Sequence, residues 1–266
     1  YTVNQTERRI YLIKELMKED DRFKRYIPEE MSFQEQKDLL RSLMNIRMPA
    51  PLKEEFTRIQ DEYLKQAIEE KGITRIESLT PVEDDIYLWQ GDITTLECDA
   101  IVNAANSQML GCFHPLHNCI DNCVHTYSGL ALRNICYDIM QKQGYEEPTG
   151  QAKITPAFNL PCEYVLHTVG PIVNMRLTDE HCELLKSCYL SCLKLAEENQ
   201  VESIAFCCIS TGVFGFPQRE AARIAVKTIR DYKRETGSNI KVIYNVFKDE
   251  DLLIYQELFQ EGIDCL

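Results

Sequence analysis

Residues 99–106 read DAIVNAAN, a short apolar run that ends in two asparagines, Asn103 and Asn106. A short apolar run with polar residues at its end is typical of a strand inside a covered sheet. Similar runs occupy residues 85–93, 151–158, 163–171, 203–210 and 240–247. Long amphipathic segments, near 118–143, 179–199, 217–236 and 249–261, alternate with these runs. The alternation predicts a three-layer α/β domain with helices on both faces of its sheet.

The first part of the chain has a different pattern. Helical periodicity fills residues 8–19, 32–46 and 51–72, and no strand signal interrupts it. Ser32 and Glu35 have the spacing of a capping box, and Gly72 is placed to end the third helix. We therefore expect a helical N-terminal extension over residues 1–80 and the α/β domain over residues 81–266.

Composition limits the classes of partner. Of the 266 residues, 44% are hydrophobic, which is enough for a sizeable core, and 42 acidic against 29 basic residues give a net charge of -13. The negative electrostatic field of such a chain would repel the phosphate backbone of a nucleic acid, so we expect no nucleic-acid partner. The twelve cysteines show no secreted disulfide pattern, and no apolar run approaches the roughly 20 residues of a membrane span. A cytoplasmic protein without membrane contact is expected.

Four segments place small, amide-bearing or glycine residues where a predicted strand or loop ends. They are 91–94, 103–106, 111–122 and 210–217. Ligands of α/β sheets bind beyond the carboxyl ends of strands, so these segments are candidates for one site. The last segment precedes a helix that begins near Gln218, and its backbone N–H groups could hold a diphosphate despite the negative net charge.

The segment 111–122, GCFHPLHNCIDN, contains a candidate metal site. Cys112, His117 and Cys119 form a C-x4-H-x-C pattern, and thiolate and imidazole ligands suit zinc better than magnesium or calcium. Cys123 or His114 would complete a closed structural site. We favour three protein ligands, which leave one position for water or substrate. Because two thiolates cancel the charge of the ion, such a zinc would orient a hydroxyl or a water more than activate it.

Taken together, the segments resemble the macrodomain family, whose members bind ADP-ribose across the C-terminal edge of a mixed six-stranded sheet in an α/β/α fold. The resemblance is carried by GDIT at 91–94, DAIVNAAN at 99–106, IDNCVHTYSGLALRNIC at 120–136, PTGQAKIT at 148–155, YVLHTVGP at 164–171 and SIAFCCISTGVFGFP at 203–217.

One departure narrows the resemblance. Where the common hydrolytic macrodomains have a run of glycines, this chain has residues 112–121 with the candidate metal ligands. This pattern is similar to the zinc-containing macrodomain branch of microbial operons that also encode a sirtuin-type ADP-ribosyltransferase and a lipoylated carrier protein. The resemblance implies removal of ADP-ribose from protein, with the carrier as a possible partner.

The resemblance also implies roles for single residues. Asp92, beside the Ile93 backbone, would accept the adenine amino group, Asn106 would fix the distal ribose with Asn103 in support, and Phe247 would stack on adenine. The phosphate loop would comprise Ser210, Thr211, Gly212, Val213, Phe214, Gly215 and Phe216, with Phe214 or Phe216 as a lid. Turn-capping roles for Asp92 and the asparagines, and a core position for Phe247, are the alternatives. We expect His125 and His167 to be satisfied buried histidines outside the site.

Asp121 follows the last candidate ligand and is the expected catalytic residue. It would act as general base for a water that attacks the anomeric carbon, or would stabilise positive charge on the ribose. The leading hypothesis is a zinc-dependent hydrolase that removes mono-ADP-ribose from acidic side chains of modified protein. An ADP-ribose reader without catalysis and an O-acetyl-ADP-ribose deacetylase are the alternatives, and a reader would gain little from Asp121.

Overall fold

The computed structural model describes residues 3–261. Its central sheet has six strands in the order β2-β8-β7-β4-β6-β5. The strands are β2 (Ile86–Gln90), β4 (Ala100–Ala105), β5 (Ala152–Pro156), β6 (Tyr164–Val169), β7 (Ser203–Phe206) and β8 (Lys241–Val246). All neighbours are parallel except β5 and β6, so the expected mixed six-stranded sheet is confirmed.

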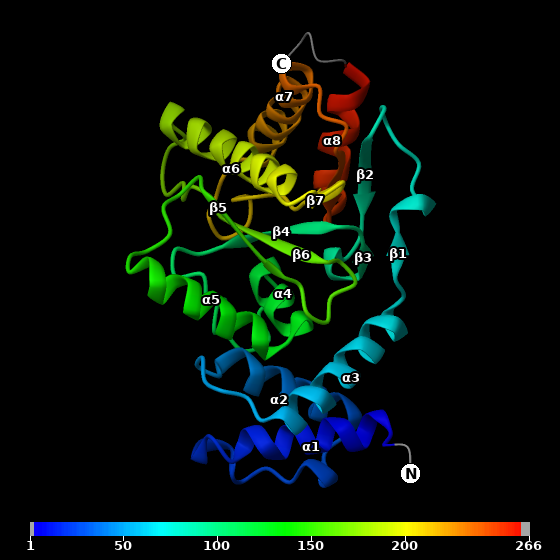
Figure 1. Cartoon of the computed structure of the whole chain (residues 1–266), viewed down its shortest axis with the longest axis vertical. Helices are drawn as coiled ribbons and strands as arrows, with labels where there is room; N and C mark the ends of the chain where they lie inside the picture. The colour runs from blue at the N-terminus through cyan, green and yellow to red at the C-terminus, as the bar shows by residue number, and fades with distance from the viewer. Residues whose placement is uncertain (1–2, 262–266) are drawn as a thin grey trace.

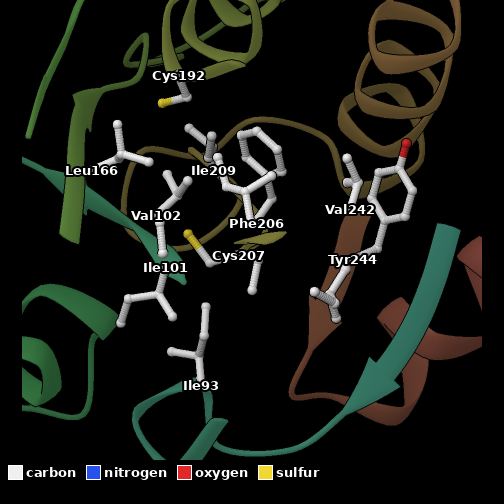
Figure 2. Close-up of a cluster of buried hydrophobic side chains, with 14 of the residues drawn as sticks. Ile93, Ile101, Val102, Leu166, Cys192, Phe206, Cys207, Ile209, Val242 and Tyr244 are labelled. Atoms are coloured by element: carbon white, nitrogen blue, oxygen red, sulfur yellow. The ribbon is translucent and has the colours of Figure 1, made fainter. Parts of the chain in front are cut away.

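Helices cover both faces of this sheet, which confirms the three-layer arrangement. Figure 1 shows α6 (Asp179–Glu198), α7 (Gln218–Thr236) and α8 (Asp249–Glu261) on one side, and α4 (Ile120–Ser128) and α5 (Leu130–Gln143) on the other. Between the layers lies the main core, where Ile101 and Val102 of β4 and Phe206 of β7 are almost fully buried (Figure 2). Each such side chain contributes about 1.5–3 kcal/mol when it leaves water.

The N-terminal region forms α1 (Gln5–Met17), α2 (Phe33–Ile46) and α3 (Glu54–Lys71), as the periodicity predicts. The Ser32–Glu35 capping box is present, with the backbone N–H of Ser32 donating to Glu35 and that of Glu35 donating to Ser32 Oγ. These helices have a hydrophobic core of their own, to which Leu130 of α5 also belongs. They lie beyond α4 and α5 in Figure 1. A two-stranded parallel sheet, β1 (Thr74–Arg75) with β3 (Leu96–Glu97), joins the linker to the α/β domain.

One helix prediction is wrong. A single helix was expected over 118–143, but the chain forms α4 and α5 with Gly129 between them. Gly129 has φ 103°, and an added Cβ would lie 3.0–3.2 Å from side-chain atoms of Gln60 and Asn159. Gln60 of α3 also accepts the backbone N–H of Leu130 at 2.9 Å. A tertiary contact with the N-terminal helices therefore starts a second helix where the sequence pattern alone continues the first.

The long apolar stretches of the chain belong to the main core between the sheet and its helices. Among residues 3–261, no helix combines the length and the apolarity that crossing a bilayer requires.

Candidate functional site

The carboxyl ends of four parallel strands lie along one edge of the sheet. These are β2, β8, β7 and β4, which are neighbours in that order. The segments 91–94, 103–106 and 207–217, together with Phe247, follow or end these strands, so the structure gathers them at the same edge. Between β2 and β8 the backbone N–H of Gly91 donates to the Val246 carbonyl, and Asn245 Nδ2 donates to the Gly91 carbonyl, both at 3.0 Å.

The loop after β7 is built to expose backbone N–H groups. Ser210 and Gly215 have φ of 64° and 72°, and the N–H of Phe216 donates to the Ser210 carbonyl at 2.9 Å. The N–H groups of Gly212, Val213 and Phe214 donate to none of the described residues. The next helix, α7, begins after Pro217, and no side chain caps it. Successive free N–H groups beside a helix N-terminus form an anion-binding loop.

The aromatic residues near this loop divide into two groups. Phe216 is 2% exposed and belongs to the main core, so it does not have the position expected of a lid. Phe214 is half-buried in the loop. Phe247 is 74% exposed, which excludes the alternative that it fills the core. An exposed ring at the end of β8 is available for stacking on a flat ligand.

Asp92 and Asn106 are both engaged in turns. Asp92 Oδ1 accepts the backbone N–H of Thr94 at 2.9 Å, and its Oδ2 lies 3.3 Å from Lys71 Nζ of α3. Asn106 Nδ2 donates to the Gly111 carbonyl at 3.0 Å, while its Oδ1 accepts the N–H of Gln108 at 3.1 Å. The turn-forming alternatives are therefore present in both cases, and the ligand-binding roles stay predictions. The side chain of the next residue, Ile93, lies in the main core (Figure 2).

The candidate metal ligands come together in the structure. The sulfurs of Cys112 and Cys119 and a ring nitrogen of His117 all lie within 4.8 Å of one another, and Cys112 Sγ is 3.8 Å from His117 Nδ1. Tetrahedral bonds of about 2.0–2.3 Å place zinc ligand atoms about 3.3–3.8 Å apart, so the types of donor and the Cys112–His117 distance fit zinc. Within residues 3–261, neither His114 nor Cys123 joins the cluster. The three-ligand arrangement is the one that the side chains present.

The loop that carries these ligands is strained and half-buried. Met109, Phe113 and Leu116 have positive φ of 66°, 44° and 61°, conformations that cost a non-glycine residue about 1 kcal/mol or more. Cys119 is the N-cap of α4, where its sulfur accepts the backbone N–H of Asn122 at 3.3 Å. Burial raises the pKa of the Cys119 thiol to about 12. A bound cation would reverse this shift because it stabilises the thiolate.

Asp121 lies in the first turn of α4, directly behind the metal loop. It is 5% exposed, and Asn103 Nδ2 donates to its Oδ1 at 2.8 Å. Burial raises the pKa of Asp121 to about 6, while the Asn103 hydrogen bond and the charge of Arg133 act in the opposite direction. The carboxyl group is therefore ionised at neutral pH yet basic enough to accept a proton.

A buried polar chain extends from Asp121 across the sheet. Asn103 Nδ2 lies 3.2 Å from His167 Nδ1, and His167 Nε2 lies 2.9 Å from Thr155 Oγ1. Because the Asn103 amide donates to His167, we assign the His167 proton to Nε2. Burial lowers the pKa of His167 to about 4, so the ring is neutral. This arrangement fixes the orientation of the amide that holds Asp121.

The expectation for the two histidines is wrong in part. His167 is hydrogen-bonded, but it supports the site instead of lying apart from it. His125 is buried 3.6 Å from Asp121 Oδ1, and neither ring nitrogen has a hydrogen-bond partner among the described residues. Burial lowers the pKa of His125 well below its usual range. The two rings therefore differ in role: His167 holds the Asn103 amide, whereas His125 lies directly beside the carboxylate.

Several residues of the site were not predicted from the sequence. Arg41, Asn45, Asn122 and Arg133 all contact the metal loop or its immediate neighbours. Arg133 Nε donates to the Leu110 carbonyl at 2.7 Å, and its guanidinium lies 4.2 Å from the centre of the Phe113 ring. The signal for Arg133 was an arginine within the helical run LALRNIC, and Asn122 lies at the end of the candidate segment 111–122, although neither was assigned a role. Arg41 and Asn45 had no signal in the sequence.

Comparisons with known proteins place the chain among proteins of one fold. A family model described as Macro domain matches residues 102–225. A protein of Treponema medium named protein-ADP-ribose hydrolase is 57% identical over 96% of this chain and 99% of its own. The Oceanobacillus iheyensis macrodomain with ADP is 36% identical, with a TM-score of 0.63 over 71% of this chain and 97% of its own. The Trypanosoma brucei macrodomain in complex with ADP-ribose is 29% identical, with a TM-score of 0.63 over 86% and 96%.

Proposed function

This chain belongs to the macrodomain family, and from that premise we propose that it is a hydrolase that removes ADP-ribose from ADP-ribosylated protein. The observation that carries the proposal is the position of Asp121. Asp121 lies two residues after the last candidate metal ligand, its carboxylate is buried and held by Asn103 of β4, and the carboxyl end of β4 shares a sheet edge with that of β7. A module that only binds ADP-ribose would gain nothing from burying a basic carboxylate there, because burial of a charge costs free energy.

The sheet edge suits the nucleotide part of the substrate. We propose that the free N–H groups of Gly212, Val213 and Phe214 hold the diphosphate, and that Phe247 stacks on the adenine. The loop N–H groups and the N-terminus of α7 at this edge would bind an anionic ligand although the chain has a net charge of -13.

Asp121 is the proposed general base. In hydrolysis, a water oxygen attacks the anomeric carbon of the ribose while Asp121 accepts a proton from that water. The bond from this carbon to the modified side chain breaks, and its electron pair leaves with the departing group. A carboxylate leaves without a strong acid, which agrees with a site that offers one basic carboxylate. We therefore propose mono-ADP-ribose on aspartate or glutamate as the substrate.

We further propose that Cys112, His117 and Cys119 hold a zinc ion. Bound zinc would supply a neutral centre with an open position that orients a ribose hydroxyl or a water. The support is the donor set and its spacing within 4.8 Å. The resemblance to the zinc-containing, sirtuin-linked branch suggests a lipoylated carrier protein as the modified partner, and this part of the proposal rests on that resemblance alone.

Release of labelled ADP-ribose from a protein modified on glutamate tests the function. Turnover that stops on chelation and returns with zinc is the expected result. Binding of ADP-ribose without any release, with zinc present, would identify a reader instead. Parallel measurement of kcat/KM for O-acetyl-ADP-ribose would show whether the protein or the small ester is the better substrate.

A further inference from the structure

The N-terminal helices have no role in the chemistry above, yet α2 lies against the metal loop. Arg41 Nη2 donates to the carbonyl of the candidate ligand His117 at 2.9 Å. One turn later, Asn45 Oδ1 accepts the backbone N–H of Leu116 at 3.0 Å. Both contacts join residues more than 70 positions apart in the sequence. The side chains of α2 therefore fix the backbone of the loop directly before its last ligand.

A second set of contacts reaches the sulfur atoms through Asn122. Arg41 Nη2 donates to Asn122 Oδ1 at 3.1 Å, and Thr126 Oγ1 donates to the same oxygen at 3.1 Å. With its oxygen held in this way, Asn122 turns Nδ2 toward the loop, where it donates to Cys112 Sγ at 3.3 Å and to the His114 carbonyl at 2.9 Å. Its backbone N–H donates to Cys119 Sγ. Asn122 thus contacts both candidate thiolate ligands.

Asn45 contributes to the same orientation. Its Nδ2 donates to Thr126 Oγ1 at 3.0 Å, so the Thr126 hydroxyl hydrogen is left to point at Asn122. An amide held by two donors at its oxygen cannot flip without placing NH₂ against them. Two residues of α2, Arg41 directly and Asn45 through Thr126, therefore select the Asn122 rotamer that serves the sulfur of Cys112.

The far end of α2 holds the start of the loop. Arg133 Nη1 donates to the carbonyls of Met44 and Arg47 at 3.0 and 2.7 Å, while its Nε donates to the Leu110 carbonyl. The backbone conformations of Phe113 and Leu116 are strained, and strained conformations persist only when surrounding contacts hold them. Contacts with α2 supply this restraint at both ends of the loop.

We infer that helix α2 is part of the metal site, with Arg41 and Asn45 as positioning residues that hold the 111–119 loop and the Asn122 amide in the ligand-ready arrangement. The N-terminal helices then form one functional unit with the α/β domain. The part of this inference that concerns zinc rests on the proposed function. The part that concerns the ordering of the loop by α2 does not.

The test compares full-length Arg41→Met and Asn45→Leu with Lys37→Met. Lys37 lies one turn earlier on α2, over the Phe33 ring, and serves as the matched control. Zinc affinity is measured by competition with a chromophoric chelator. We expect about 10- to 100-fold weaker binding in the first two variants and less than about threefold change in the control. Far-UV circular dichroism should stay at the wild-type level in all three variants.

A double-mutant cycle with Asn122→Leu isolates the route through the amide. If Arg41 acts partly through Asn122, Arg41→Met costs less metal affinity in the Asn122→Leu background than in the wild type. Equal costs in both backgrounds would contradict the route through Asn122. Wild-type zinc affinity in both Arg41→Met and Asn45→Leu would overturn the inference.

Hydrogen exchange of residues 110–119 in the metal-free protein separates this inference from the proposed function. Exchange should be at least about tenfold faster in Arg41→Met and Asn45→Leu than in Lys37→Met. If the wild type bound no zinc, the zinc proposal would be wrong, but the exchange rates would still decide the role of α2. Unchanged exchange would refute that role, and if Arg41→Met did not fold, Asn45→Leu would provide the same comparison.

Discussion

The side-chain amide of Asn103 donates to Asp121 Oδ1 at 2.8 Å, and this bond joins β4 to the first turn of α4. Asn103 is fully buried, and its other amide hydrogen is directed to His167. Both donors of the amide are thereby committed, which fixes Asp121 relative to the sheet edge. An asparagine within the strand β4 thus supports the proposed catalytic carboxylate.

Replacement of Asn103 by leucine should reduce kcat by at least about tenfold, because the freed carboxylate loses a charge-assisted hydrogen bond and its position. ADP-ribose affinity, measured by calorimetry, should change by less than about threefold, since the diphosphate and adenine contacts lie elsewhere on the edge. A large loss of affinity with unchanged kcat would mean that Asn103 serves ligand binding instead.

Removal of a metal ligand should strongly weaken zinc binding without unfolding the protein. Cys119→Ser should lower the affinity for zinc by more than the roughly 10- to 100-fold that follows loss of a residue hydrogen-bonded to a ligand, because here the ligand sulfur itself is lost. Cys123→Ser is the matched control, since Cys123 lies one turn later outside the cluster. Thermal unfolding should be similar in both. Global unfolding of Cys119→Ser alone would indicate a structural metal.

Phe247→Ala should weaken ADP-ribose binding by about 1–3 kcal/mol, the range for loss of one base-stacking aromatic. Because the ring is 74% exposed, the free energy of unfolding should change little. Leu253→Ala on α8 removes a similarly exposed apolar side chain and should leave affinity unchanged. Equal affinities for the two variants would remove Phe247 from the adenine site.

The buried His167 should make stability depend on pH. Its pKa is about 4 in the folded protein against 6.5 in the unfolded chain, so the unfolded state binds more protons between these values. Stability attributable to His167 is complete above pH 6.5 and falls by roughly 3 kcal/mol as pH drops to 4. The difference between wild type and His167→Gln in denaturant unfolding should shrink over this range.

Local signals in the sequence predicted the helices and strands well. The Ser32–Glu35 capping box and the strand at 99–106 depend on neighbouring residues alone, and both are present. The break at Gly129 was missed because it depends on Gln60, which is distant in sequence. Phe216 resembled a loop aromatic, yet its side chain turns into the core.

The candidate site was predictable where its residues are adjacent in the chain. Cys112, His117 and Cys119 are close in sequence and meet in space. Arg41 and Asn45 carry no motif, and only the packing of α2 on α4 brings them to the loop. His167 was expected to lie outside the site, because no sequence pattern distinguishes a buried strand histidine that supports a site from one that does not. Its role depends on the register that pairs it with Asn103.

The most direct test of the account is the rate at which Asp121→Asn releases ADP-ribose from a glutamate-modified protein, with zinc present and ADP-ribose affinity measured in parallel. Loss of the general base should lower kcat by about 10²- to 10⁴-fold while affinity stays within about threefold of wild type. A variant that binds ADP-ribose normally and retains most of the wild-type rate would contradict the assignment of Asp121 and, with it, the proposed mechanism.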